Sequence, residues 1–384
     1  MNLTEFRSVP EILFGAGLAR RLGDVLARRC KGRRVFVATD AGFHGTGLLR
    51  QPLDSLGEAG FTVTLFTGVV ADPPTEVVQH AVRCCRDADC DVVLGVGGGS
   101  SMDVAKLVAA LALTGQDISD AYGIDRLAGP RLPLMQMPTT AGTGSEATPV
   151  AIVTTGAQSK MGVVSPLLLC DIALLDPSLT LGLPAGVTAA TGVDAMVHAV
   201  EAYTSRLRKN PLSDQAAREA LRLLGRAIER ACEDGADLHA RSDMLLGAML
   251  AGQAFANAPV AAVHALAYPV GALFHIPHGV SNALMLGPVL RFNAEAAARP
   301  YAELAALLIP NAIGSDTDRA LALADYFEAL ITRLKLPVHL SDVGISAADL
   351  PTLAEQAMQQ QRLLVNNPRT VELADALALY QRAY

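Results

Sequence analysis

The chain has 384 residues, of which 51% are hydrophobic and 18% are charged, and its formal net charge at pH 7 is −7. This composition excludes extended disorder, and the length exceeds what one compact core usually holds, so we expect two domains. The acidic balance and the absence of long lysine or arginine runs argue against nucleic acid as a partner.

The first half of the chain alternates apolar runs with helical patterns. Residues 18–30 have helical spacing, and short apolar runs bounded by glycine or proline predict strands at residues 11–14, 34–39, 61–67, 91–96 and 132–137. This alternation predicts a parallel sheet with helices on both faces, a Rossmann-like α/β domain. Ligands of such sheets bind beyond the carboxyl ends of the strands.

A glycine-rich turn, GVGGGSSMDVAK at residues 95–106, follows one of these strands. Gly97, Gly98 and Gly99 allow the backbone to approach a diphosphate, and a helix starting near Ser100 or Ser101, with Ser101 as its cap, would point free N–H groups at it. The motif is neither GxGxxG nor a P-loop. A tight strand-to-helix connection without a ligand is the alternative interpretation.

A second polar loop, PTTAGTGSEAT at residues 138–148, follows the strand at 132–137. It offers hydroxyl and backbone N–H groups to a ribose or a nicotinamide amide, although it could also simply lead into a hairpin. Asp40 ends another strand, where a carboxylate can bind ribose hydroxyls and would repel a 2′-phosphate. We therefore expect NAD rather than NADP, with an ordinary turn residue as the alternative for Asp40.

Long helical patterns replace the strands after residue 184, at residues 187–205, 213–233 and 243–257, with Ser213 expected as a helix N-cap. We therefore predict an α/β domain at residues 1–184 and an all-helical domain at residues 185–384. The charge-free stretch at residues 244–290 contains prolines, histidines and amides, which favours a buried core over a membrane span.

The pattern of the cysteines and the sequence of the N-terminus indicate the cellular compartment in which we expect the protein. The six cysteines form no C-x-x-C pattern, which favours small buried thiols in a reducing environment over disulfides. The first ten residues contain no apolar segment typical of a signal peptide. We expect a cytoplasmic protein without a membrane or nucleic-acid partner.

Asp194, His198, His264 and His278 form a candidate metal site. Asp194 and His198 are four residues apart on one predicted helix, so their side chains share a face. His264 and His278 lie in the charge-free stretch, where imidazoles need partners for their ring nitrogens. Such ligands suit iron(II), zinc, cobalt or nickel, and an open position would make the ion a Lewis acid. Hydrogen-bonded core residues are the alternative.

Several ordered motifs together resemble the iron-containing, or group III, alcohol dehydrogenase family. They are GGGSSMDVAK, PTTAGTGSEAT, the segment at residues 160–179, ATGVDAMVHAVEAY, HALAYPVG and IPHGVSNALM, and the resemblance runs from about Pro10 to the region of Asn367 and Arg369. It implies the dehydroquinate-synthase-like fold, with a nucleotide domain followed by a helical metal-binding domain.

The resemblance also implies the residues of both sites. The metal ligands would be Asp194, His198, His264 and His278. Glu201, on the same helix face as His198, could orient a ligand or be a solvated carboxylate. The family's dinucleotide positions correspond to Asp40, Gly98, Gly99, Thr139, Thr140, Thr143, Lys160, Leu179 and Gly182. We also expect Gly97, Ser100 and Thr148, in the same two loops, to bind NAD.

The chain departs from the family at one position. The family commonly has a second histidine four residues after the third ligand, whereas this chain has Tyr268. A phenol with an ordinary pKa near about 10 is a poorer base at neutral pH than an imidazole. Tyr268 could donate a hydrogen bond or shape the pocket, and His275 is an alternative proton shuttle. A surface position is the alternative interpretation for His275.

The expected reaction is reversible hydride transfer between an alcohol and NAD, with iron(II) as the expected metal and zinc as a second candidate. The competing functions are a maleylacetate-type oxo-acid reductase, a dehydroquinate-synthase-like lyase and a non-catalytic scaffold. No charged anchor for an acidic substrate is recognisable near the ligands, which favours small uncharged or diol-like alcohols. The resemblance further implies a homo-oligomer.

Overall fold

The computed structural model describes residues 5–156 and 159–384, so the first four residues of the predicted α/β domain lie outside the described part. The chain forms two compact units: one comprises Ser8–Leu181, and the other comprises Met1–Arg7 together with Gly182–Tyr384. Arg7 joins the helical unit through Asn257, whose side-chain Oδ1 accepts the Arg7 backbone N–H at 2.6 Å and whose Nδ2 donates to the Arg7 carbonyl at 2.8 Å.

The α/β unit is built on a six-stranded parallel sheet with the order β1-β9-β6-β4-β2-β3. Its strands are β1 (Glu11–Phe14), β2 (Arg34–Asp40), β3 (Thr62–Val69), β4 (Val92–Gly97), β6 (Leu134–Pro138) and β9 (Ile172–Leu175). The central strand β4, with the sequence VVLGVG, is buried throughout, because helices on both faces of a parallel sheet exclude water. The predicted parallel sheet is confirmed, although β9 was not among the predicted strands.

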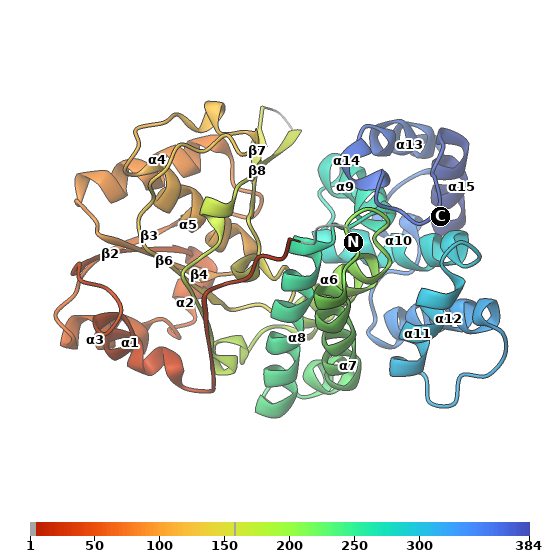
Figure 1. Cartoon of the computed structure of the whole chain (residues 1–384), viewed down its shortest axis with the longest axis horizontal. Helices are drawn as coiled ribbons and strands as arrows, with labels where there is room; N and C mark the ends of the chain where they lie inside the picture. The colour runs from red at the N-terminus through yellow and green to blue at the C-terminus, as the bar shows by residue number, and fades with distance from the viewer. Residues whose placement is uncertain (1–4, 157–158) are drawn as a thin grey trace. The chain divides into compact units, whose positions relative to one another are not determined.

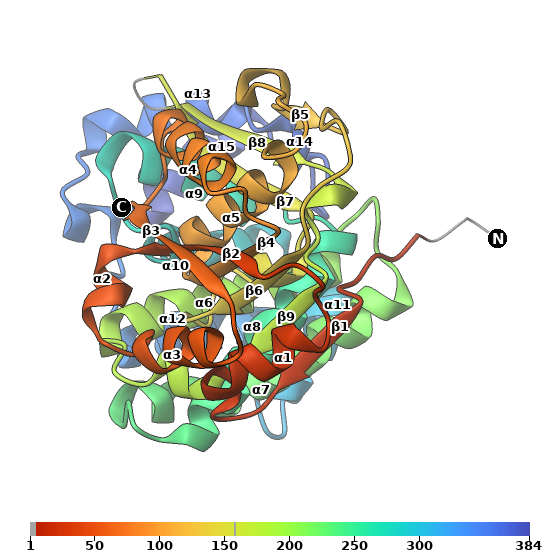
Figure 2. The same cartoon turned by 90° about the vertical axis from the view of Figure 1, so that its left-hand side faces the viewer.

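Helices cover both faces of the sheet, as Figures 1 and 2 show, with α4 and α5 on one face and α1 and α3 on the other. The helices of this unit are α1 (Leu22–Ala27), α2 (Ala41–Gly45), α3 (Arg50–Glu58), α4 (Thr75–Asp87) and α5 (Gly99–Leu111). A smaller sheet of β5 (Gly123–Ile124), β8 (Ser159–Val164) and β7 (Val150–Thr155) completes the unit. In it β7 and β8 pair antiparallel, which agrees with the hairpin given as the alternative interpretation of the loop at residues 138–148.

The helical unit has three long helices at its start: α6 (Ala185–Thr204), α7 (Pro211–Glu233) and α8 (Leu238–Asn257), which pack against one another. The helix α6 is buried over almost its whole circumference from Thr188 to Thr204, which is typical of a central helix. The remaining helices are α9 (Ala262–Phe274), α10 (His278–Asn293), α11 (Ala298–Leu308), α12 (Asp316–Arg333), α13 (Leu350–Met358), α14 (Gln361–Leu364) and α15 (Leu373–Ala383).

Two predicted helix starts in this unit were wrong. The helix α7 begins at Pro211 with Asn210 as N-cap, and the Ser213 backbone N–H donates to Asn210 Oδ1 at 3.0 Å. Ser213 therefore lies inside the helix, because the Asn-Pro pair already provides the cap and the first helical position. The helix α8 begins at Leu238 rather than near Asp243, since Asp237 accepts the backbone N–H of Ala240 at 2.9 Å.

Within the described residues, no single helix is long and apolar enough to cross a membrane. The helices α8 and α9 pass the length and composition test only as a pair, which is bent by 107°. All six cysteines are free thiols, and Cys85, Cys90 and Cys170 are buried. The predicted burial therefore holds for these three, whereas Cys30, Cys84 and Cys232 are only partly buried.

Candidate metal centre and dinucleotide site

The carboxyl ends of three adjacent strands form the candidate dinucleotide site. The strands β2, β4 and β6 end at Asp40, Gly97 and Pro138. Because these strands are neighbours in the sheet, their ends lie side by side, and the Thr139 backbone N–H donates to the Gly97 carbonyl at 3.0 Å. The glycine turn and the threonine loop, far apart in sequence, are therefore joined.

The backbone conformation and the packing of the glycine turn exclude side chains at Gly97 and Gly99. Gly97 has φ +151°, and a Cβ there would lie 2.5 Å from Ser101 Oγ. A Cβ on Gly99 would lie 2.9 Å from Thr143 Cγ2. The helix α5 begins at Gly99 with Gly98 at the N-cap position and no side-chain cap. The predicted Ser101 cap is therefore wrong, because Ser101 is the third residue of the helix and is buried beside Gly97.

Asp40 stands beside this turn. Its Oδ1 accepts the backbone N–H of Phe43 at 2.8 Å, so the carboxylate caps α2. Its Oδ2 faces the glycine turn, since a Cβ on Gly97 would come within 3.4 Å of that oxygen. The two interpretations of Asp40 are thus compatible, because the residue makes a turn and also offers one oxygen at the strand ends where a ribose would lie.

The other predicted dinucleotide residues have different surroundings. Thr140 lies by the glycine turn, because a Cβ on Gly98 would be 3.6 Å from its Oγ1. Thr148 is buried, and Lys160 on β8 forms an ion pair with Asp72 at 2.7 Å. Leu179 is part of the hydrophobic core of the α/β unit. Ser100 opens α5, and Gly182, with φ +85°, begins the helical part of the chain.

A buried lysine beneath the threonine loop was missed by the sequence analysis. Lys106 on α5 is fully buried, and its Nζ donates to Ser145 Oγ at 2.7 Å, Thr148 Oγ1 at 3.1 Å and the Val150 carbonyl at 2.7 Å. Asp103 accepts from Ser145 Oγ at 2.6 Å and lies 3.6 Å from Lys106 Nζ. These contacts fasten the threonine loop to α5 and so fix the glycine turn and the loop together.

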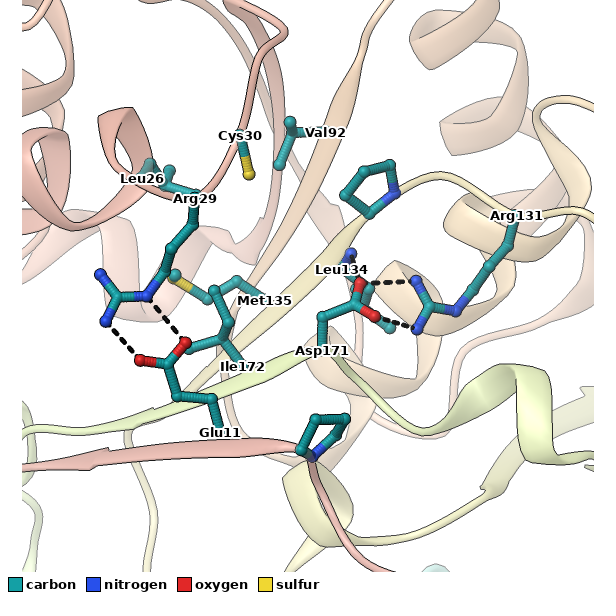
Figure 3. A pocket seen from close by; sticks show the side chains of 12 residues that line it. Glu11, Leu26, Arg29, Cys30, Val92, Arg131, Leu134, Met135, Asp171 and Ile172 are labelled. Carbon is teal, nitrogen blue, oxygen red and sulfur yellow. Dashed lines mark hydrogen bonds and ion pairs between the residues drawn. The ribbon is translucent and has the colours of Figure 1, made fainter.

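The α/β unit also has a cavity of about 760 Å³ at the opposite edge of its main sheet, shown in Figure 3. It lies at the first residues of β1, β4, β6 and β9, away from the strand ends described above. Two ion pairs border it, Arg29 with Glu11 and Arg131 with Asp171. Because each guanidinium there already has a carboxylate partner, the cavity has no free cationic group for a phosphate.

Three helices of the other unit bring the predicted metal ligands together. Asp194 and His198 lie on α6, His264 lies in the first turn of α9, and His278 is the first residue of α10. From Asp194 Oδ1 the Nε2 atoms of His198, His264 and His278 are 3.8, 3.8 and 3.6 Å away. Ligand atoms of a tetrahedral metal with bonds near 2.1 Å are separated by about 3.4 Å, close to these values.

Burial and charge distinguish this cluster from an exposed group of polar side chains. Asp194, His198 and His264 are buried, with their ligand atoms within 4.8 Å of one another, whereas the side chain of His278 is 37% exposed. Burial alone would raise the pKa of Asp194, but the imidazoles of His198, His278 and His264 outweigh it and lower the pKa below its ordinary value.

Glu201 orients one of the imidazoles and is no solvated carboxylate. It is buried one turn after His198 on α6, and its Oε2 lies 2.6 Å from His264 Nδ1. Its Oε1 accepts the backbone N–H of Val263 at 2.6 Å, which satisfies a free donor in the first turn of α9. With Nδ1 as the donor, His264 presents Nε2 as an acceptor toward Asp194, as a metal ligand must.

Asn282 stands at the centre of the cluster and was not predicted. Its Nδ2 donates to Asp194 Oδ1 at 2.6 Å and lies 3.3 and 3.2 Å from the Nε2 atoms of His264 and His278. Three acceptor atoms, one from Asp194, one from His264 and one from His278, therefore surround a single donor nitrogen. A bound metal cation interacts favourably with acceptor atoms that converge in this way. Asn282 is four residues after His278 on α10, and this helical spacing was the signal that could have revealed it.

Family models match both halves of the chain. The model described as iron-containing alcohol dehydrogenase matches residues 10–177, and the one described as Fe-containing alcohol dehydrogenase family, C-terminal, matches residues 188–384.

Curated and solved proteins match over almost the whole chain. The long-chain-alcohol dehydrogenase 1 of Geobacillus thermodenitrificans (strain NG80-2) is 39% identical, with 93% of this chain and 91% of that protein covered. The 1,3-propanediol dehydrogenase of Klebsiella pneumoniae is 37% identical, with 94% of each covered. A crystal structure of 1,3-propanediol oxidoreductase has a TM-score of 0.96 at 34% identity and covers 100% of both chains. The chain belongs to the iron-containing alcohol dehydrogenase family.

Membership of the iron-containing alcohol dehydrogenase family confirms the predicted fold and the predicted class of enzyme, an oxidoreductase acting on alcohols and carbonyl compounds. Tyr268, which stands at the family's second histidine position, lies beside the cluster, with its ring centroid 6.4 Å from that of His264 and 5.7 Å from that of His278. His275 is exposed and ends α9 in a left-handed conformation with φ 57°.

Proposed function

We propose that this chain oxidises an alcohol with NAD⁺, producing the carbonyl compound, NADH and a proton, and catalyses the reverse reaction. The observation that carries the proposal is the convergence of Asp194, His198, His264 and His278 on one point, with Glu201 behind His264. When bound, a divalent metal there supplies Lewis acidity toward the oxygen of the substrate, and the nicotinamide exchanges the hydride.

The protein residues have separate tasks in this proposal. Asp194 and the three imidazoles hold the cation, and Glu201 keeps His264 in the tautomer that presents Nε2. Phe255 stacks on His198 with ring centroids 4.3 Å apart, which fixes that imidazole. Tyr268 shapes the wall beside His264 and His278 and, with a pKa that burial raises, it keeps its proton at neutral pH.

The α/β unit is proposed to bind the dinucleotide with those predicted residues that lie at its strand ends, whereas Gly182 belongs to the helical unit and Leu179 is part of the core. At Gly97 and Gly99 the glycine turn has room only for backbone, and the free N–H groups of α5 suit a diphosphate. Asp40 offers a carboxylate oxygen beside the turn, which favours NAD over NADP. His275 as a proton shuttle remains a prediction, because none of the described hydrogen bonds or ring contacts joins it to the cluster.

A spectroscopic assay tests the function. Protein refilled anaerobically with iron(II) is mixed with NAD⁺ or NADP⁺ and a panel of alcohols, and NADH is followed at 340 nm. We expect turnover with NAD⁺ and at least about tenfold less with NADP⁺. A lyase would use no net cofactor, a maleylacetate-type reductase would act only on the oxo-acid, and a scaffold would show neither activity. Refilling with zinc tests the metal, and we expect the iron form to be the more active.

Two further properties belong to this proposal. We infer a homo-oligomer, because β1 is an edge strand of the main sheet and exposes Ile12 and Phe14, and an unpaired apolar edge favours association. Light scattering of the purified protein tests this. We also infer a cytoplasmic location, supported by the six free cysteines. Fractionation of cells that express the full chain tests it.

A further inference from the structure

Helix α4 ends in a Schellman motif, a tight turn in which two backbone hydrogen bonds close the helix. Asp89 has the left-handed conformation typical of the residue that follows such a helix, with φ 49°. Its N–H donates to the Arg86 carbonyl at 2.8 Å, and the Cys90 N–H donates to the Cys85 carbonyl at 3.1 Å. The second of these bonds joins two cysteines that are five positions apart in the sequence.

This backbone bond holds Cys85 and Cys90 at a separation that a disulfide can span. The N···O distance of 3.1 Å, together with the covalent bonds from these atoms to their Cα atoms, limits the Cα–Cα distance to no more than about 7 Å. The Cα atoms of a disulfide are usually about 4.4 to 6.8 Å apart. The side chains at these two positions of a Schellman motif also frequently contact each other.

The two thiols differ in their access to solvent and in their acidity. Cys90 is 8% exposed, whereas Cys85 is 1% exposed. A hydrogen bond from the Cys85 thiol lowers the pKa of Cys90 to about 7, and the same bond together with burial raises the pKa of Cys85. Because the thiolate is the nucleophilic form of cysteine, Cys90 is the side chain that reacts first with a small oxidant. Cys85 lies behind it as a protonated partner.

We propose that Cys85 and Cys90 form a redox pair, in which hydrogen peroxide oxidises the two thiols to an intramolecular disulfide. The Cys90 thiolate attacks one peroxide oxygen, the O–O bond breaks, and the products are a sulfenic acid on Cys90 and, after protonation, water. The Cys85 sulfur then attacks the Cys90 sulfur, so that an S–S bond forms and the S–O bond breaks. The hydroxyl group leaves with the Cys85 proton as a second water. The two sulfurs have then given two electrons to the peroxide.

The disulfide would close a turn that the backbone already forms. Its covalent loop contains only residues 85–90, whose ends the backbone bond already joins. A thiol within reach of a sulfenic acid prevents further, irreversible oxidation to sulfinic acid. In a reducing compartment such a disulfide is transient, and the resting pair is reduced. We therefore expect a reversible modification of the α/β unit, and this inference is independent of the proposed alcohol dehydrogenase function.

Peroxide treatment of the zinc-loaded holoenzyme tests the proposal, because zinc has no redox chemistry of its own. After about one equivalent of hydrogen peroxide and alkylation of the remaining thiols, two of the six cysteines should escape alkylation. Peptide mass spectrometry should identify them as a Cys85–Cys90 disulfide, and dithiothreitol should restore both thiols. Oxidation that leaves both cysteines open to alkylation would overturn the proposal. So would a disulfide that joins Cys84 to either of them.

Three alanine variants assign the roles within the pair. In Cys85→Ala, Cys90 should stop at the sulfenic acid, which dimedone traps, or proceed to sulfinic acid. In Cys90→Ala, Cys85 should react with peroxide at least about tenfold more slowly than Cys90 does in the wild-type protein. Cys84→Ala removes the partly buried neighbouring thiol and is the matched control, which should form the disulfide at the wild-type rate. Equal oxidation rates in Cys90→Ala and the wild-type protein, or loss of the disulfide in Cys84→Ala, would contradict the assignment.

Discussion

The two units each contain a buried polar cluster, and the clusters differ in whether their own chain satisfies them. In the α/β unit, Lys106 uses all three of its N–H donors on Ser145, Thr148 and Val150, and Asp103 lies 3.6 Å away as counter-charge. That cluster is complete. In the helical unit, the lone pairs of Asp194, His264 and His278 converge on a single amide donor from Asn282.

This difference distinguishes a structural polar cluster from a ligand site. In a structural cluster, the hydrogen-bond donors and acceptors of the chain match one another, whereas in a ligand site acceptors outnumber donors. The Lys106 cluster has matched charges and holds the threonine loop on α5, so no further ion is needed. In the Asp194 cluster, a carboxylate and three imidazoles converge, and Glu201 adds a second carboxylate behind His264, which is a set of groups that suits a cation. We therefore expect substitutions in the first cluster to affect stability and substitutions in the second to affect metal binding and turnover.

The largest effect is expected when a ligand of the incomplete cluster is removed. His264→Ala should lower kcat by at least about 1,000-fold, because the Lewis acid contributes several kcal/mol and each factor of ten corresponds to about 1.4 kcal/mol. The bound metal, measured by mass spectrometry, should fall in parallel. His239→Ala removes an exposed imidazole of α8 and is the matched control. Wild-type turnover in a folded, metal-free His264→Ala protein would support the scaffold interpretation.

The complete cluster should respond in stability rather than in metal content. Lys106→Met leaves the Asp103 carboxylate without its cation, and breaking a buried pair from one side costs about 3 to 5 kcal/mol. Urea unfolding of the apoprotein should show this loss, with metal affinity unchanged. The double variant Asp103→Asn with Lys106→Met removes both charges and should recover part of the stability. Equal losses in the single and the double variant would contradict the proposed pairing.

The same cluster predicts a pH dependence through Glu146, which is buried beside it. Burial raises the pKa of Glu146 from 4.5 to about 7, so the folded protein holds this proton where the unfolded chain releases it. The resulting stabilisation is fully present below pH 4.5 and is lost as the pH rises through 7. The loss is about 3 kcal/mol, at about 1.4 kcal/mol for each pKa unit.

Comparison with Glu146→Gln isolates this carboxyl group from other titrating groups. Urea unfolding at pH 5, 6, 7 and 8 should show that the stability of the wild-type protein falls relative to the variant across this range. At pH 5 the two proteins should be similar. Parallel curves at all four pH values would show that Glu146 has the same pKa in the folded and unfolded states.

The predictions from sequence succeeded where local pattern decides the structure. Apolar runs bounded by glycine and proline located the inner strands β2, β4 and β6, because a buried parallel strand needs such a run, and they also located the edge strands β1 and β3. The N-caps predicted at Ser101 and Ser213 were wrong, because Gly98 and Asn210 occupy the N-cap positions of α5 and α7. The presence of a serine near a helix start does not show which residue occupies the N-cap position.

The four candidate metal ligands could be predicted from the sequence, but not all of the residues that contact them could. The spacing of Asp194 and His198 and the charge-free context of the other histidines were visible in the sequence. Asn282 was not assigned, because it reaches the cluster only through the packing of α10 in the folded unit. Contacts between distant segments depend on tertiary structure, and residue type alone does not reveal them.

We expect the smallest effect when the substituted residue contacts a metal ligand and is not itself a ligand. Glu201→Gln keeps the size of the side chain and one acceptor for Val263, but it removes the negative charge that faces His264 Nδ1. Loss of such an outer partner lowers metal affinity by about 10- to 100-fold, so competition with a chelator should show this shift while saturating metal restores most of the turnover. Glu303→Gln, at a carboxylate that accepts from Tyr203 away from the cluster, is the matched control. An unchanged metal affinity in Glu201→Gln would mean that the backbone of α9 alone holds His264 in place. The carboxylate of Glu201 would then stabilise the N-terminus of α9 and have no effect on the metal.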